Sequence, residues 1–189
     1  MTLENGWIGS VGENRHTIWG VKHARSLILA LFMVVAAGAT AADEAWVVRP
    51  DGVGSVRIGM TLAQLNKALD ENLQAPAAKS QADCFYVSTS KPVKLLFMML
   101  EGRVARIDVR EPGIKTASGI QVGDSEAHAR KVYGARLKVE PQKYVEHGHY
   151  LTAKTSDGRR GIRFEAVGGK ITSYYAGRDQ AIQLVEGCQ

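Results

Sequence analysis

Apolar residues between positions 56 and 110 follow first a helical and then a strand pattern. Leu62, Leu65 and Leu69 recur at intervals of three and four residues, which predicts one buried helix face. Thr61 stands before this helix as a good N-cap residue, and Gln64 lies three positions later to close a capping box. Three strands are expected after the helix, in the segments 84–90, 91–100 and 101–111.

The second half of the chain repeats this order. Ser125 is the expected N-cap of a helix over 125–134, which carries Ala129, Val132 and Tyr133 as its apolar residues. Gly134 is its expected C-cap. A polar stretch follows, and three strands are then expected in the segments 148–158, 159–169 and 170–179.

Two pairs of similar segments connect the halves. Residues 58–61 align with 122–125 at an offset of 64, and residues 101–104 align with 168–171 at an offset of 67. Similar offsets at two separated places favour a degenerate duplication. The predicted fold class is therefore α+β, with two tandem units that each form a helix and a three-stranded antiparallel meander, together one sheet-rich domain. The units are 43–115 and 116–189.

The strands carry further signals. Ile107 and Val109 alternate with Arg106 and Asp108, and Phe164 is followed and preceded by charged residues, so the sheet should have one solvent-exposed face. Hairpin turns are expected at Glu101-Gly102, Asp157-Gly158 and Gly168-Gly169. The run from Val93 to Leu100 is apolar on both sides, which favours a central strand covered on both faces; a strand whose outer face meets a partner is the alternative.

The N-terminal region reads as a secretory signal peptide over residues 1–42. A basic cluster at residues 22–25 precedes an apolar run over 27–39, and the expected cleavage follows Ala41 or Ala42. The apolar run is shorter than the roughly 20 residues that a membrane span requires. Residues 1–20 form a longer polar segment than a leader usually has before its basic cluster. Either the translation start is misassigned, or the leader is a genuine long one.

Composition narrows the function classes. The chain has 189 residues, of which 45% are hydrophobic, and 24 Lys and Arg against 19 Asp and Glu give a net charge of +5. This is typical of a globular protein. Because basic residues never form a run longer than two, the charge does not indicate a nucleic-acid-binding surface. We expect a periplasmic or secreted protein with no membrane span in the mature chain.

Cys84 and Cys188 are expected to form a disulfide, because two cysteines in an exported chain most often pair. Such a bridge would connect the C-terminal tail to the middle of the chain. A redox or nucleophilic thiol is the alternative, but the chain has no C-x-x-C motif that would support it.

The turn Ile58-Gly59-Met60-Thr61, with the helix and meander after it, carries a resemblance. It resembles the small outer-membrane assembly lipoproteins of the SmpA/OmlA type, over residues 58–69 and more faintly over 122–134. Two such units in tandem resemble the fold of beta-lactamase inhibitory protein and its relatives. The resemblance implies a non-enzymatic binding role. The chain departs from it by lacking a lipobox cysteine and by having one bridge across both units.

Candidate catalytic and metal-binding residues are few. His147 and His149 would share one side of a strand and could chelate zinc or copper, but a site needs further ligands, and His128 is the one other mature histidine. Ser125 lacks the surroundings of an esterase nucleophile, and Gly168-Gly169-Lys170 lacks the spacing of a phosphate-binding loop. We therefore expect no cofactor and no metal.

The candidate binding residues are basic and aromatic strand residues: Arg106, Arg110, Arg163, Tyr174 and Tyr175. They support an exported, non-enzymatic protein-binding module, of the inhibitor or envelope-assembly kind, with an envelope or extracellular protein as partner. A glycan or small-ligand binder is one alternative. A small metal-dependent hydrolase that uses His147 and His149 is the other.

Overall fold

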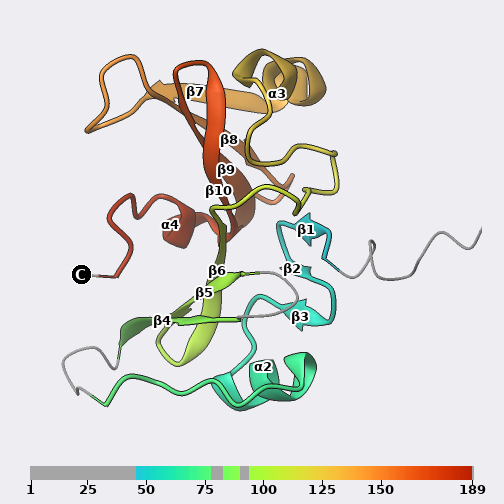
Figure 1. Cartoon of the computed structure of the whole chain (residues 1–189), viewed down its shortest axis with the longest axis vertical. Helices are drawn as coiled ribbons and strands as arrows, with labels where there is room; N and C mark the ends of the chain where they lie inside the picture. Colours follow the sequence, from blue (N-terminus) through green and yellow to red (C-terminus); the bar gives the residue numbers. More distant parts are fainter. Residues whose placement is uncertain (1–45, 78–82, 90–93, 189) are drawn as a thin grey trace, which may run out of the picture. The chain divides into compact units, whose positions relative to one another are not determined.

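The computed structural model describes residues 46–77, 83–89 and 94–188, which form a sheet-rich α+β unit (Figure 1). The predicted signal peptide and Val93 lie outside the described residues. Within them, three short strands form a small antiparallel sheet: β1 (Val48–Arg49), β2 (Gly52–Val53) and β3 (Val56–Arg57).

A seven-stranded antiparallel sheet forms the centre of this unit, in the order β4-β5-β6-β10-β9-β8-β7. Its strands are β4 (Cys84–Ser88), β5 (Leu96–Leu100), β6 (Arg103–Val109), β7 (Leu137–Pro141), β8 (His149–Lys154), β9 (Arg160–Val167) and β10 (Lys170–Arg178). The described helices are α2 (Leu62–Leu69), α3 (Glu126–Tyr133), α4 (Asp179–Ile182) and the 3-10 helix η2 (Gly134–Arg136).

The pairing of β6 with β10 joins the two halves of the sheet. Gly177 lies opposite Arg106 in this pairing, and a Cβ atom at Gly177 would lie 2.2 Å from the carbonyl oxygen of Ala105. Only glycine allows this close approach of the two backbones. The predicted hairpin turns connect β5 to β6, β8 to β9 and β9 to β10.

The start of α2 confirms the predicted cap. The Thr61 hydroxyl accepts a hydrogen bond from the Gln64 amide at 3.3 Å, and the Gln64 side chain accepts one from the Thr61 amide at 2.9 Å. Leu65 is fully buried, while Leu62 and Leu69 are half-buried against the core. The helix therefore presents to the core the face that the leucine spacing predicts.

The start of α3 is built in the same way. The Ser125 hydroxyl accepts a hydrogen bond from the His128 amide at 3.1 Å, and Gly134 is the C-cap. The amide of Gly123 donates to the carbonyl of Ile171 at 2.8 Å, as the amide of Gly59 donates to the carbonyl of Val104 at 2.7 Å. Each helix start is thus hydrogen-bonded to a strand at the corresponding place in its half.

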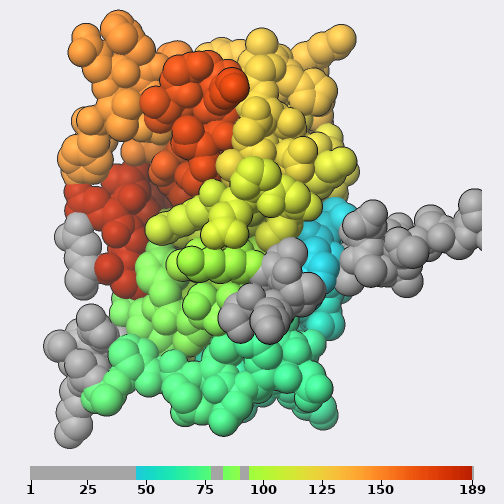
Figure 2. All heavy atoms as spheres, in the orientation of Figure 1, coloured from blue at the N-terminus to red at the C-terminus, as the bar shows by residue number. Residues whose placement is uncertain are grey.

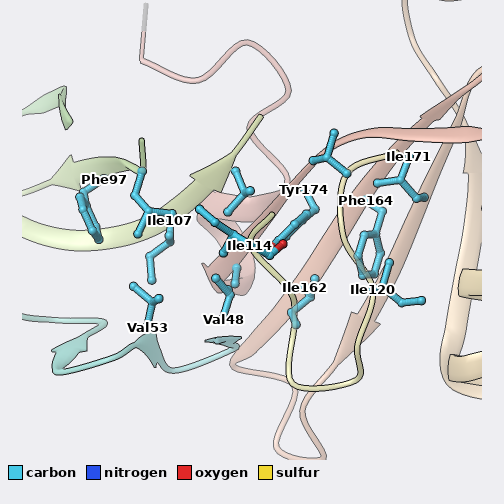
Figure 3. Close-up of a cluster of buried hydrophobic side chains, with 14 of the residues drawn as sticks. Val48, Val53, Phe97, Ile107, Ile114, Ile120, Ile162, Phe164, Ile171 and Tyr174 are labelled. Atoms are coloured by element: carbon cyan, nitrogen blue, oxygen red, sulfur yellow. Dashed lines mark hydrogen bonds between the residues drawn. The ribbon is translucent and has the colours of Figure 1, made fainter. Parts of the chain in front are cut away.

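One hydrophobic core extends through both halves (Figure 3). It includes Phe97 and Ile107 from the first half and Phe164 and Tyr174 from the second. The segment between the halves contributes Ile114, whose carbonyl accepts a hydrogen bond from the Tyr174 hydroxyl at 2.9 Å. The core therefore bridges the predicted boundary between the units.

The second half contains one more strand than the pattern predicts. β7 lies where a polar connection was expected, and it pairs with β8 as an edge strand. Its Leu137 and Val139 are only half-buried, so the apolar signal is weak. Pro141 at its end is compatible with an edge strand, where a missing amide costs no ladder hydrogen bond.

The apolar strand β5 is covered on both faces, as the favoured interpretation predicts. Phe97 and Met99 lie in the main core, whereas Met98 lies in a second buried cluster with Ala105 and Ala181. All three β5 residues have 0% exposure. The strand therefore belongs to the interior.

The predicted disulfide between Cys84 and Cys188 is present, with a sequence separation of 104 residues. Replacing both cysteines with serine should lower the free energy of unfolding by about 2–4 kcal/mol, because the bond restricts a long loop in the unfolded chain. Urea denaturation followed by circular dichroism would measure this. The wild type should respond to a reducing agent and the double variant should not; equal midpoints for oxidised wild type and variant would contradict the prediction.

Candidate functional site

The C-terminal segment, residues 179–188, covers part of the sheet face opposite the main core. Ala181 of α4 packs with Met98 and Ala105, and the disulfide packs against this cluster. A Cβ atom at Gly187 would lie 2.6 Å from the Tyr86 hydroxyl, so glycine lets the segment approach β4 closely. The sheet is thus buried on its second face where this segment crosses it.

This coverage corrects the prediction of a solvent-exposed sheet face. Arg106 is 2% exposed, Asp108 is 1% exposed and Arg163 is 5% exposed. The alternation identified which side chains point away from the main core, and this was right. The prediction that water covers them was wrong, because the C-terminal segment takes the place of water there.

Arg106 anchors the C-terminal segment to the sheet. Its guanidinium binds Asp108 through two hydrogen bonds of 2.7 and 2.9 Å. It also donates to the carbonyls of Ala181 and Leu184 at 2.9 and 2.7 Å, and to the Tyr86 hydroxyl at 2.5 Å. These contacts use the full set of five N–H donors that arginine carries. Arg106 therefore binds the C-terminal segment of its own chain.

Two tyrosine side chains, Tyr86 and Tyr175, lie next to the Arg106 guanidinium. The guanidinium carbon lies 4.4 Å from the centroid of the Tyr175 ring, which is within cation–π distance. Burial, aided by the Asp108 carboxylate, raises the pKa of Tyr86 to about 12. Its hydroxyl therefore stays protonated at neutral pH, accepts from Arg106 and donates to Asp108 at 3.4 Å.

Arg163 is a second arginine bound within the chain. It donates to the hydroxyl of Thr152 at 3.2 Å and to the side-chain carbonyl of Gln183 in the C-terminal segment. Its guanidinium carbon lies 4.1 Å from the centroid of the Tyr150 ring. A guanidinium nitrogen lies 3.7 Å from a carboxylate oxygen of Glu140. Like Arg106, it holds the C-terminal segment on the sheet.

The other predicted binding residues separate into two environments. Tyr174 has 0% exposure and lies in the main core, so its ring is not accessible at the surface. Arg106, Arg110 and Tyr175 line one cleft of about 390 Å³, bordered by residues 185–187. The Arg110 side chain is 61% exposed at this cleft. Glu165 lines it too and accepts hydrogen bonds from Ser173 and Tyr175.

The two candidate metal-binding histidines do not share a strand face. β8 begins at His149, while His147 lies in the preceding turn with φ of 58° and a side chain that is 91% exposed. His149 instead places Nδ1 3.0 Å from a carboxylate oxygen of Glu126 on α3. Within the described ranges, no group of three potential metal-binding side chains occurs.

The structure also exposes hydrophobic residues that the pattern missed. The large hydrophobic side chains most exposed among the described residues are Tyr144, Val145 and Leu184, at 61%, 37% and 40%. The first two lie in the β7–β8 loop, and Leu184 lies in the C-terminal segment. We call these three residues the loop–tail surface. Lys143 joins its two parts, because its ammonium lies 3.6 Å from a carboxylate oxygen of Glu186.

Figure 2 shows this loop in orange and the C-terminal segment in red along one side of the molecule. A shallow hollow of about 310 Å³ lies between them, lined by Lys143, Leu184 and residues 185–187. The sequence gives a weak signal for this surface, an apolar pair at 144–145 within a polar stretch, which periodicity does not detect. The C-terminal segment, which carries Leu184, lies beside this loop only in the folded chain, where Lys143 and Glu186 form their ion pair.

No protein-family model matches the chain, and no curated protein matches it. Among solved structures, the chain is similar to an extracellular protein containing an SCP domain from Bacillus anthracis str. Ames, with a TM-score of 0.44 and 9% sequence identity. The match covers 70% of this chain and 47% of that protein, so it spans about half of that protein's length. Among the described residues, no helix has the length and hydrophobicity to cross a membrane.

Replacing Arg106 with methionine should leave Asp108 buried without its main counter-charge, because the Arg110 guanidinium approaches the carboxylate only to 3.8 Å. We expect Arg106→Met to lower the free energy of unfolding by about 3–5 kcal/mol, as for other broken buried ion pairs. Adding Asp108→Asn should restore part of the loss. Arg49→Met, which removes an exposed arginine from β1, should change stability by less than about 0.5 kcal/mol. Urea denaturation of the four proteins would measure this, and equal effects of the two arginine variants would refute it.

Glu126 should make stability depend on pH. Burial acts to raise its pKa, but hydrogen bonds from His149 and Arg130 outweigh burial and hold the pKa below its ordinary value of 4.5. The ionised carboxylate therefore stabilises the fold above pH 4.5, and this contribution is lost as the pH falls through the lower folded-state pKa. Urea midpoints from pH 6 to pH 3 should fall less steeply for Glu126→Gln than for the wild type. Glu111→Gln, at an exposed position, should follow the wild type.

Proposed function

We propose that the chain is an exported, non-enzymatic protein that binds another protein through the loop–tail surface. The observation that carries this proposal is the exposure of Tyr144, Val145 and Leu184 on two adjacent segments connected by the Lys143–Glu186 ion pair. Exposed apolar side chains that gather on one surface mark interaction sites. Tyrosine is enriched among the residues that contribute most to protein–protein affinity.

The ion pair and the disulfide favour recognition by a preformed surface. Lys143 also places its ammonium 4.8 Å from the Tyr144 ring centroid, which restricts the position of the ring. Leu184 belongs to a segment fixed by Arg106 and by Cys188. A partner that binds here loses less conformational entropy than one that must order a free tail.

Export rests on the disulfide and on the predicted signal peptide. Disulfides persist in oxidising compartments and are rare in the cytosol, so the bond between Cys84 and Cys188 fits a periplasmic or secreted protein. The signal peptide over residues 1–42 is supported by its basic, apolar and small-residue order. The proposed partner is accordingly an envelope or extracellular protein.

We infer that the scaffold for this function is a pair of tandem units, 43–115 and 116–189. The matched helix starts support this inference, since Thr61 and Ser125 cap equivalent helices and Val104 and Ile171 accept equivalent hydrogen bonds. The additional strand β7 distinguishes the second unit. The resemblance to tandem inhibitory and assembly proteins would follow from such a duplication.

A glycan or small-ligand binder is the second candidate, and the cleft lined by Arg110 and Tyr175 favours it. Its volume of about 390 Å³ lies within the range of small-molecule sites, about 300–1,000 Å³. Glu165 and Ser173 add hydrogen-bonding groups to it. Such a ligand would bind beside the C-terminal segment, at the cleft rather than at the loop–tail surface.

Site-specific photocrosslinking tests the protein-binding proposal. A photoreactive residue at Val145 should capture a discrete protein in the native compartment, whereas one at Lys67, which is exposed on α2, should not. Adding Tyr144→Ala to the Val145 probe should weaken the isolated complex about tenfold or more, the usual effect of truncating a central aromatic contact. Identical products from both probe positions, or none from Val145, would contradict the proposal.

A further inference from the structure

The ends of β9 and β10 place two arginines directly opposite each other. Arg160 and Arg178 are register partners in this antiparallel pair, so their side chains lie on the same face of the sheet. Both residues are half-buried. In the described part of the chain neither makes an ion pair with a carboxylate. Like charges placed directly opposite on neighbouring strands are destabilising, so this arrangement needs a counter-charge.

These two arginines border a cleft of about 500 Å³ that also contains Arg159. Its opposite wall is Ile58 and Gly59, from the turn that precedes α2. The cleft therefore lies where the strand ends of the second half meet the first half. Arg103 of β6 donates a hydrogen bond to the Gly59 carbonyl at 3.0 Å, which brings a further positive charge near this wall.

The carboxylates near the cleft are already bound to other cations. Asp179, which lines the cleft, accepts a 2.7 Å hydrogen bond from the Lys154 ammonium. Asp157 accepts one of 2.8 Å from Arg159. Among the residues that the structure describes, Arg160 and Arg178 therefore have no ion-pair partner.

We propose that this arginine cleft binds a phosphoryl group. A phosphoryl dianion carries two negative charges and three acceptor oxygens, which match two facing guanidinium groups better than a single carboxylate does. Arginine forms paired, planar hydrogen bonds with such oxygens, and a half-buried pair is less screened by salt than a surface pair. The cleft exceeds the size of a bare phosphate ion, so it also accommodates part of the molecule that carries the group. This site is separate from the loop–tail surface, and the proposal does not depend on the proposed function.

Titration with inorganic phosphate is the direct test, followed by NMR of the backbone amides and arginine side chains. We expect saturable shifts at Arg160 and Arg178 that sodium chloride of equal ionic strength does not reproduce. The double variant Arg160→Gln and Arg178→Gln should weaken binding about tenfold, the effect of losing charge-assisted hydrogen bonds. Arg49→Gln, which removes an exposed arginine from β1 and leaves the cleft intact, should change binding by less than about twofold.

Thermal denaturation supplies a second readout. Without phosphate, Arg160→Gln should melt at a higher temperature than the wild type, because it removes the opposition of like charges. Phosphate should raise the melting temperature of the wild type but not that of the double variant. Shifts that do not saturate, shifts equal to those in chloride, or an unchanged affinity in the double variant would each overturn the proposal.

Two further probes separate the sources of the phosphoryl group. Glycerol 3-phosphate tests a small soluble molecule, and phosphatidylcholine vesicles with and without phosphatidic acid test a lipid headgroup. Binding of glycerol 3-phosphate that requires Arg160 and Arg178 supports a soluble ligand. Binding to the vesicles that requires both phosphatidic acid and these arginines supports a lipid ligand. Vesicle binding that is equal in the double variant counts against the cleft.

Discussion

The hydrogen-bonded contact between Arg106 and the C-terminal segment is the interaction on which much of the structure depends. A guanidinium can be buried only when its charge and all its donors find partners, and Asp108, Tyr86 and two carbonyls of the C-terminal segment meet that requirement. The contact closes the second face of the sheet, forms one border of the Arg110–Tyr175 cleft and fixes Leu184 beside the β7–β8 loop. Arg163 and the disulfide hold the same segment at other points.

Local signals in the sequence predicted local structure well. Thr61, Gln64, Ser125 and Gly134 act through neighbours within four residues, so the helix caps follow from spacing alone. The disulfide was predictable for a different reason, since Cys84 and Cys188 had no other cysteine with which to pair. The helix faces followed from the apolar spacing, because both helices pack against a single core.

The features that the sequence did not predict depend on contacts between distant residues. Alternation places Arg106 on the face away from the main core, but its burial comes from carbonyls 75 and 78 residues later. Arg160 and Arg178 become neighbours only through the register of β9 with β10. His147 was assigned to a strand because the sequence does not show that β8 begins two residues later. The candidate binding residues were therefore identified by chemistry, while their accessibility was decided by packing.

The strand order has a consequence for folding. β6 is complete at residue 109, whereas its partner β10 begins only at Lys170, 61 residues later in the chain. During synthesis, the β4-β5-β6 meander can form early, but the free side of β6 then remains an unpaired edge open to pairing with other chains. Contacts of such long sequence separation also slow folding. The central pair of the sheet, which joins the halves in the finished protein, is therefore a place where a growing chain can pair wrongly.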